Sequence, residues 1–303
     1  MFVLPDDLIQ TTLGVHQDKG QAWLDEFETL LRYCEERWSF RVLETPFPLS
    51  YHFVAPVVYP DGSEAVLKLG VPCDSMRMEM EALRLYNGRG IVRLLDADAD
   101  RGIMLLERVK PGDTLKSVPD DEEATLIAAG VMRQIRTPAP GGSLFPSTVD
   151  WAKGFQKLRN HFQGGTGPLP EDMVNKAEQT FAKLNGSIKH PQLLHGDLHH
   201  DNILLGEGER WLAIDPKGLI GEAEYGVIPF LMNHLPDDKQ AQAELTARRV
   251  DLLVRELGLN KERVLAWGYC HGVLSAWWCV EDQVDGMQGG LDMATLFDEL
   301  AKR

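Results

Sequence analysis

The hydrophobic pattern changes near residue 110, and this change constrains the fold more than any other feature of the sequence. Before it, short apolar runs rich in strand-forming residues predict strands at 40–44, 52–59, 64–70, 91–98 and 102–109. The segment "KPGDTL" at 110–115 breaks this pattern, and the chain beyond it has mostly helical periodicity. We therefore expect an α+β fold with two lobes, a small β-sheet followed by a larger and mainly helical lobe.

One helix is expected to pack against the predicted sheet, at 74–86. Its apolar side chains share one face at helical spacing: Met76, Met80, Leu83 and Tyr86. Asp74 can cap the start of this helix, and Asn87-Gly88 can end it. The turn sequence "YPDGS" at 59–63 joins the two preceding strands as a hairpin.

Helices are predicted for most of the second lobe, at 121–136, 151–163, 171–185, 237–257, 260–281 and 291–302. One non-helical stretch interrupts them, "QLLHGDLHHDNILLGEGERWLAID" at 192–215. Two apolar runs flank its turn "GEGE", which predicts a hairpin with a polar cluster at its entry and Asp215 at its exit. We expect lobes at 1–108 and 109–303 with the polar groups between them, because ligand sites often lie between domains.

Composition excludes several classes of protein. The formal net charge of −15 disfavours nucleic-acid partners and suits a cationic small molecule, although an acidic surface also simply keeps a protein in solution. The four cysteines form no C-x-x-C pair and are too sparse for a disulfide framework, which indicates a reducing compartment. Without a signal peptide or a long apolar run, we expect a cytoplasmic protein with no membrane contact.

The polar cluster at 195–202 has the spacing that phosphoryl transfer requires. Asp197 and Asn202 stand in the order D-x-x-x-x-N, which in kinases supplies a base and a metal-binding amide. A metal-binding aspartate should follow at the end of the next strand, where Asp215 stands. In the small lobe, Lys68 lies in mid-strand, and Glu79 or Glu81 of the following helix can pair with it.

Metal-dependent hydrolysis is the competing interpretation of the same cluster. Its side chains include several competent metal ligands: His195, Asp197, His199, His200 and Asp201. However, the run lacks the helical H-E-x-x-H pattern, and hydrolysis leaves Lys68, Asn202 and Asp215 without a role. We therefore favour phosphoryl transfer, and we expect His195 to brace the loop by hydrogen bonds.

The motifs "HGDLHHDN", "IDPKG" and "GEAEYG" resemble those of the aminoglycoside phosphotransferase superfamily. Within it, the sequence is similar to the branch of streptomycin 6-kinases and hydroxyurea phosphotransferases, over about residues 40–285. The resemblance implies a protein-kinase-like bilobal fold with an N-terminal nucleotide-binding lobe and a C-terminal catalytic and substrate-binding lobe. It also implies an enzyme that uses ATP and Mg²⁺ to phosphorylate a hydroxyl group of a small molecule.

Roles for individual residues follow from this resemblance. Asp197 would be the catalytic base, and Asn202 and Asp215 would bind Mg²⁺. Lys68 would grip the phosphates of ATP with Glu79 as its partner, and the backbone of Glu107 to Val109 would meet the adenine. No G-x-G-x-x-G precedes Lys68, so another loop would cover the phosphates through Ser50. The sequence shows no activation segment, and we therefore expect no protein substrate.

The acceptor is the least determined part of the interpretation. Four carboxylates, with Asp285 beside them, could form an acidic wall for a guanidinium or ammonium group, or could be ordinary surface residues: Glu222, Glu224, Glu281 and Asp282. Trp277 and Trp278 could belong to the core or form a platform for a cation. The resemblance favours an aminoglycoside of the streptomycin type, as in antibiotic inactivation. Another polyol, amino alcohol or hydroxyurea-like acceptor, or a pseudokinase that only binds nucleotide, are the alternatives, and either a monomer or a homodimer is compatible with the sequence.

Overall fold

The computed structural model describes residues 3–303 except residues 46, 48, 50 and 143. The chain forms two compact units. The first contains the residues up to Gly112 together with Gly206–Arg210, and the second contains Asp113–Leu205 and Trp211–Arg303. The tip of the hairpin that the sequence predicts near residue 207 therefore packs with the first unit.

The first unit is built on a five-stranded antiparallel sheet in the order β1-β2-β3-β5-β4. Its strands are β1 (Arg41–Val42), β2 (Phe53–Val58), β3 (Glu64–Leu69), β4 (Leu94–Asp98) and β5 (Ile103–Glu107). All of the predicted strands are confirmed, with shorter bounds than the apolar runs suggest. In the centre of the sheet, Lys68 of β3 is paired with Val54 of β2 and Met104 of β5.

The predicted helix is α3 (Asp74–Tyr86), which buries Met76, Met80, Leu83 and Tyr86 as expected. It ends at Asn87, whose backbone is left-handed, as the pair Asn87-Gly88 predicts. The expected cap at Asp74 is wrong. Cys73 occupies the N-cap position and makes no side-chain cap hydrogen bond, whereas Asp74 is already helical and can act only on the helix dipole.

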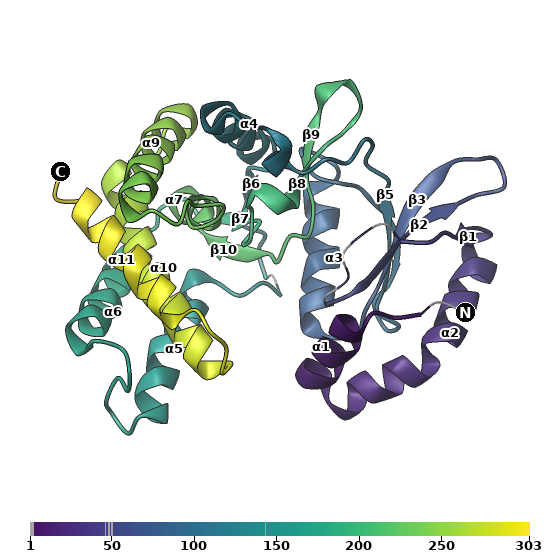
Figure 1. The fold of residues 1–303 in the computed structure, drawn as a ribbon, viewed down its shortest axis with the longest axis horizontal. Helices are drawn as coiled ribbons and strands as arrows, with labels where there is room; N and C mark the ends of the chain where they lie inside the picture. Colours follow the sequence, from purple (N-terminus) through teal and green to yellow (C-terminus); the bar gives the residue numbers. More distant parts are fainter. Residues whose placement is uncertain (1–2, 46, 48, 50, 143) are drawn as a thin grey trace. The chain divides into compact units, whose positions relative to one another are not determined.

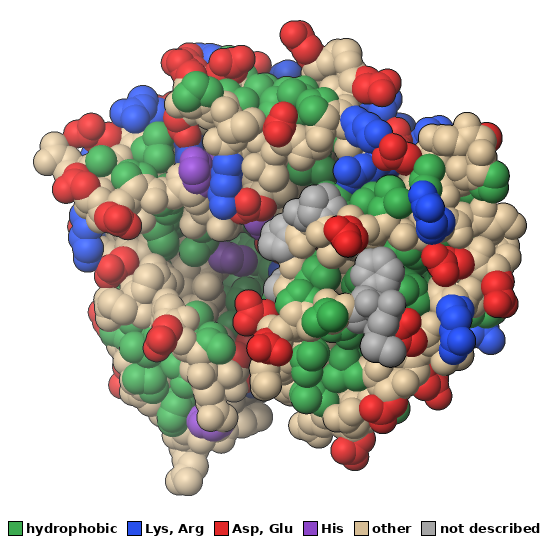
Figure 2. Space-filling view, turned by 45° about the vertical axis from the view of Figure 1, so that its right-hand side comes forward, with side chains coloured by type: hydrophobic (Ala, Val, Ile, Leu, Met, Phe, Trp, Pro, Cys, Tyr) green, Lys and Arg blue, Asp and Glu red, His purple; other side chains and the backbone are tan. Residues whose placement is uncertain are grey.

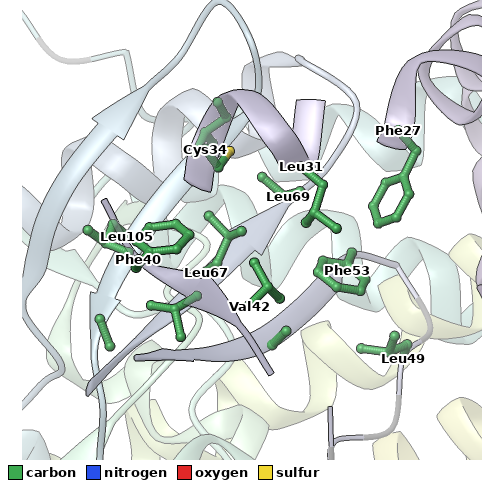
Figure 3. Close-up of a cluster of buried hydrophobic side chains, with 14 of the residues drawn as sticks. Phe27, Leu31, Cys34, Phe40, Val42, Leu49, Phe53, Leu67, Leu69 and Leu105 are labelled. Atoms are coloured by element: carbon green, nitrogen blue, oxygen red, sulfur yellow. The ribbon is translucent and has the colours of Figure 1, made fainter. Parts of the chain in front are cut away.

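Two helices that the sequence analysis does not predict precede the sheet, α1 (Asp6–His16) and α2 (Asp18–Trp38). They lie on the opposite face of the sheet from α3 (Figure 1). Trp23, Phe27, Leu31 and Cys34 of α2 are buried against inward-facing residues of β2, β3 and β5, which include Leu67 and Leu69 (Figure 3). Because side chains alternate along a strand, Lys68 between these two leucines points to the other face, toward α3.

The second unit is mainly helical. Its helices are η1 (Leu115–Ser117), α4 (Asp121–Gln134), α5 (Thr148–His161), α6 (Glu171–Asn185), α7 (Ala223–Gly226), α8 (Ile228–Leu231), α9 (Lys239–Leu257), α10 (Lys261–Glu281) and α11 (Met287–Leu300). α10 is buried on most sides and packs on α5, α6 and α11. It approaches α11 so closely that a Cβ atom on Gly272 would lie 2.8 Å from the backbone of Gly290.

Short strands interrupt these helices and carry the polar cluster. β7 (Gln192–Leu194) lies between β6 (Thr137–Pro138) and β10 (Leu219–Gly221) in one small antiparallel sheet. β8 (Ile203–Leu205) and β9 (Trp211–Ala213) form the predicted antiparallel hairpin, and the short turn η3 (Glu207–Glu209) lies between them. The 195–202 loop therefore runs from the end of β7 to the start of the hairpin.

The formal net charge of −15 reflects a surplus of acidic side chains. On the face that Figure 2 displays, Asp and Glu side chains are scattered and do not gather in one patch. None of the helices in the described part of the chain combines the length and the apolar character that spanning a bilayer requires.

Candidate active site

A buried ion pair lies between the sheet of the first unit and α3. Lys68 Nζ lies 2.7 Å from Glu79 Oε1 and 2.9 Å from Glu79 Oε2, and only 3% of Lys68 is exposed. Glu81, the alternative partner, is on the exposed side of α3 and pairs with Arg84 instead. Removing two charges from water is unfavourable unless the two groups are in close contact. The contact of Lys68 Nζ with both oxygens of Glu79 therefore holds the two side chains in defined positions.

The segment after β5 is the predicted adenine-binding segment. The backbone N–H of Glu107 donates to Arg93 O, and its carboxylate accepts hydrogen bonds from Arg93 and Arg210. Val109 is buried. The N–H of Glu107 is therefore not available to a base. The backbone groups that follow it in the segment are the ones that can contact the adenine. Ser50, the predicted contact to the phosphates, lies outside the described residues.

His195 ties the polar loop of the second unit to the strand that follows the hairpin. Its Nδ1 accepts a hydrogen bond from Asp197 N at 3.2 Å, so its Nε2 carries the proton that is donated to Ile214 O at 2.8 Å. Burial lowers the pKa of His195 to about 4, against the raising effects of Ile214 O and the nearby carboxylates. A neutral His195 thus braces the loop, as the sequence predicts.

Asp197, Asn202 and Asp215 are brought together by this loop. Asn202 Nδ2 donates to Asp197 O at 2.9 Å, which holds the amide nitrogen against the loop backbone. Asn202 O accepts from Ile214 N at 3.0 Å, and Asp215 follows directly with a left-handed backbone at φ 57°. Since Ile214 is hydrogen-bonded to both His195 and Asn202, it fixes Asp215 beside the two other residues.

The carboxylate of Asp197 faces Lys217, the lysine of the motif "IDPKG". Lys217 Nζ lies 2.9 Å from Asp197 Oδ2, and His199 Nε2 lies 3.9 Å from Asp197 Oδ1. About 31% of the Asp197 side chain is exposed, so it is accessible to a ligand. Lys217 N donates to His195 O, which places the lysine on the same loop framework as the carboxylate.

The other histidines of the cluster do not form a metal site. His200 is buried and stacks on Phe230 with ring centroids 4.3 Å apart, while its Nε2 accepts a hydrogen bond from Arg249 Nη2. His199 accepts from Asp201 N and so caps the short turn η2 (His200–Asn202). Within the part of the chain that the structure describes, no three His, Cys, Asp or Glu side chains are arranged to hold a metal ion.

The four carboxylates predicted to bind the acceptor do not form one wall. Glu222 is buried, its oxygens accept from Arg263, and Trp267 Nε1 donates to it as well. Glu224 accepts from Asn260 N, so this pair lies at the start of α10. Glu281 is the last residue of α10, where it pairs with Lys157, and Asp282 follows it. α10 has 21 residues and is about 30 Å long, so the two pairs lie toward opposite ends of it.

We expect the neutral, buried histidines to make the protein sensitive to mild acid. Burial lowers the pKa of His195 to about 4 and that of His200 to about 3, the latter with help from Arg249. Both protonate near pH 6.5 in the unfolded chain, so their contribution to stability is complete above pH 6.5 and is lost as the pH falls toward 4. Each should lower the free energy of unfolding by up to about 1.4 kcal/mol per pH unit in that window.

Urea denaturation at a series of pH values between 7 and 5 measures this slope. His200→Asn should reduce the slope, because it removes one of the groups that take up a proton on unfolding. His190→Asn, at an exposed position, is the matched control and should leave the slope unchanged. An equal slope in His200→Asn and in the wild type would contradict the prediction.

The fold is protein-kinase-like. Choline kinase LicA from Streptococcus pneumoniae superimposes with a TM-score of 0.65 at 15% identity, over 92% of this chain and 100% of that one. At such low identity the likeness concerns the fold.

Sequence comparison is more specific. The chain is 33% identical to streptomycin 6-kinase of Streptomyces glaucescens over 283 residues, 92% of this chain and 91% of the relative. It is 32% identical to hydroxyurea phosphotransferase of Kitasatospora aureofaciens over 285 residues, 92% and 81% respectively. Residues 44–283 match the family model described as aminoglycoside/hydroxyurea antibiotic resistance kinase. The chain belongs to this family and is a phosphotransferase.

Proposed function

We propose that the protein transfers the γ-phosphate of ATP to a hydroxyl group of a cationic aminoglycoside of the streptomycin type. The observation that carries this proposal is the convergence of Asp197, Asn202 and Asp215 through the hydrogen bonds of His195 and Ile214. The streptomycin 6-kinase of S. glaucescens supports the acceptor class. The net charge of −15 is compatible with a cationic substrate.

In this proposal Lys68 binds the α- and β-phosphates of ATP. An ammonium group held by Glu79 has a defined position, and in kinases this pair must be in place for transfer. Backbone groups of the segment from Glu107 to Val109 contact the adenine. The N–H of Glu107 is already used, so its carbonyl and the backbone of Val109 are the groups that we assign to this contact.

Asn202 and Asp215 fit Mg²⁺ by the chemistry of their donor atoms. Mg²⁺ prefers hard oxygen ligands and is usually held by one or two protein groups together with phosphates and water. The amide nitrogen of Asn202 is engaged by Asp197 O, which leaves the amide oxygen as the ligand, and Asp215 offers a carboxylate beside it. Bound Mg²⁺ would supply positive charge that offsets the charge on the transferred phosphoryl group.

Asp197 acts as the base in this mechanism. The acceptor hydroxyl donates a hydrogen bond to the carboxylate and is oriented toward the γ-phosphate. It loses its proton to Asp197 as the new P–O bond forms, while the bond between the γ-phosphorus and the bridging oxygen of the β-phosphate breaks and ADP leaves. Lys217 holds one carboxylate oxygen at 2.9 Å, so the other remains for the acceptor. His195 and Asn202 keep the loop from moving away from this geometry.

A coupled assay of ADP release with ATP and Mg²⁺ tests the proposal. The acceptors are streptomycin, other aminoglycosides, hydroxyurea, and a panel of amino alcohols and sugars. Turnover with streptomycin alone would support the proposed acceptor. Turnover only with another compound would support the phosphotransferase activity and reject an aminoglycoside as the acceptor. Nucleotide binding without turnover on any acceptor would favour a pseudokinase.

Breaking the ion pair between Lys68 and Glu79 should change the kinetic parameters for ATP more than those for the acceptor. We expect Lys68→Met to lower kcat/KM by about 10²-fold or more, because it removes a charge-assisted contact to the phosphates. Glu79→Gln should have a smaller effect of the same kind, because the lysine remains but loses its orientation. The measurement is kcat and KM for each substrate varied separately.

Glu81→Gln is the matched control on the same helix, since Glu81 is partly exposed and pairs with Arg84. It should leave both KM values unchanged. If Glu81→Gln and Glu79→Gln were equally impaired, the role assigned to the buried pair would be wrong.

A further inference from the structure

Three aromatic side chains of the second unit gather around one histidine. His271 and Trp278 come from α10, Trp151 from α5 and Tyr225 from α7. The ring centroids of His271 lie 5.6 Å from Tyr225, 5.6 Å from Trp278 and 6.3 Å from Trp151, and the two tryptophans are 5.3 Å apart. Tyr225 is buried, whereas the other three side chains are partly exposed. The cluster therefore combines one buried tyrosine with three partly exposed residues, two tryptophans and a histidine.

Tyr225 determines which nitrogen of His271 carries the proton. The Tyr225 hydroxyl lies 2.6 Å from His271 Nδ1, and among the described residues it has no second hydrogen-bond partner. A buried hydroxyl with one partner donates to it, because leaving its hydrogen unpaired is unfavourable. Burial also raises the pKa of Tyr225 well above 10, so the hydroxyl keeps its proton. His271 Nδ1 is thus an acceptor and Nε2 carries the hydrogen.

His271 Nε2–H is a donor prepared for a ligand. No described residue accepts a hydrogen bond from it, and the ring is partly exposed. Burial lowers the pKa of His271 to about 4, while Asp197 nearby acts to raise it and Lys217 to lower it. The imidazole is therefore neutral near pH 7. The proposed base and its lysine are close enough for their charges to act on this ring.

Partly exposed residues of α10 continue along the helix from His271. His271, Ser275 and Trp278 are all partly exposed and follow one another at intervals of four and three residues, which puts them on one side of the helix. Gly154 of α5 allows the close packing there, since a Cβ atom at that position would lie 2.6 Å from Leu274. The imidazole donor of His271, the hydroxyl of Ser275 and the indole of Trp278 thus form a row that is about 10 Å long.

We propose that this row is a binding subsite for the acceptor, with His271 as its specificity-determining residue. It rests on the proposed function above. His271 Nε2–H donates a hydrogen bond to an oxygen of the acceptor beside the hydroxyl that Asp197 deprotonates. Trp151 and Trp278 pack against a sugar or cyclitol ring, and their faces also suit its cationic substituents. Tyr225 is a positioning residue, because it acts only through the tautomer of His271.

The chemistry of the row selects a class of acceptor. A neutral donor beside two indole rings recognises a hydroxylated ring with an apolar face. It offers little to an acceptor without a ring, because such a molecule cannot cover the tryptophans. We therefore expect ring-containing, polyhydroxylated cations to bind in preference to short amino alcohols.

Calorimetric titration of streptomycin, together with the ADP-release assay, tests this subsite. The variants are His271→Leu, His271→Gln and Tyr225→Phe. His271→Leu should raise the Kd and the acceptor KM by about tenfold, the share of one hydrogen bond, without changing the KM for ATP. His271→Gln should stay within about threefold of the wild type, because its amide N–H can replace Nε2–H. Tyr225→Phe should raise the Kd and the acceptor KM by an amount between those of His271→Leu and His271→Gln.

Tyr269→Phe is the matched control. It removes a hydroxyl from the same helix, but one that donates to Met173 O on the α6 side, so streptomycin binding should not change. Thermal unfolding shows which variants remain folded, and Tyr225→Phe tests the subsite if His271→Leu does not fold.

The outcomes separate the subsite from the proposed function. A wild-type protein that binds and phosphorylates streptomycin, with folded His271→Leu and Tyr225→Phe variants that do so equally well, would overturn the subsite alone. A loss in His271→Leu that appears equally in the KM for ATP would also overturn it. A wild type that neither binds nor phosphorylates streptomycin would overturn the aminoglycoside proposal and this subsite together.

Discussion

Replacing Asp197 with asparagine is expected to lower the rate of phosphoryl transfer by about 10²- to 10⁴-fold, the usual contribution of a general base. Asparagine keeps the shape of the side chain but cannot accept the hydroxyl proton. It also loses the charge that pairs with Lys217 at 2.9 Å. The measurement is kcat for ADP release at saturating ATP and acceptor, with the KM for ATP determined in parallel.

The effect should concern catalysis and leave the fold unchanged. Asp197 is partly exposed, and its side-chain partner Lys217 is 60% exposed, so the lost ion pair should contribute less than about 1 kcal/mol to stability. Asp201→Asn is the matched control, because Asp201 is a partly exposed carboxylate of the same loop that pairs with Lys116. Equal activity in Asp197→Asn and Asp201→Asn would show that Asp197 is not the base.

Arg249→Met is expected to lower the free energy of unfolding by about 3–5 kcal/mol, the effect of breaking a buried ion pair by removing one partner. Arg249 of α9 is completely buried. Its Nε donates to Asp121 at the start of α4, and its Nη1 donates to Asn233 O at 2.8 Å. It also donates to His200 Nε2 and packs over the ring of Phe230. Methionine fills similar space but satisfies none of these acceptors.

Chemical denaturation followed by circular dichroism measures this loss. Arg248→Met is the matched control, because Arg248 is the exposed neighbour on the same helix, and it should change stability by less than about 0.5 kcal/mol. Arg249→Lys should recover only part of the loss, since one ammonium group cannot reach all of the acceptors. If Arg249→Met were as stable as Arg248→Met, the buried network would not stabilise the fold.

Local pattern was sufficient for most of the secondary structure. The strands around Lys68 and the helix that begins at Asp74 are predicted within a few residues, because alternating and helical burial are visible in a single segment. The helices α1 and α2 are not predicted, although Trp23, Phe27, Leu31 and Cys34 have helical spacing. These apolar residues stand among many charged ones, so the pattern within the segment does not by itself indicate a buried helix. The helices are explained by the tertiary structure, in which they cover the face of the sheet opposite α3.

The same contrast holds for the site. The spacing of Asp197 and Asn202, and the place of Asp215 after a hairpin, could be read along the chain because these residues are adjacent or joined by one short hairpin. The four acceptor carboxylates were grouped wrongly, because the length of α10 that separates them is a property of the folded helix. His271 gave no signal, since a single histidine in an apolar helix is usually a core residue.

By itself, the sequence determined the α+β organisation, the polar loop and the residues proposed for transfer, because these depend on patterns within short segments. The resemblance already favoured Glu79 over Glu81 as the partner of Lys68. Only the tertiary structure showed that both oxygens of Glu79 contact Lys68, that Lys217 pairs with Asp197, and that Tyr225 orients His271. Each of these pairs depends on which face of an element is buried and on which element packs against it. Such contacts join residues 11 to 46 positions apart, and spacing along the chain does not specify them.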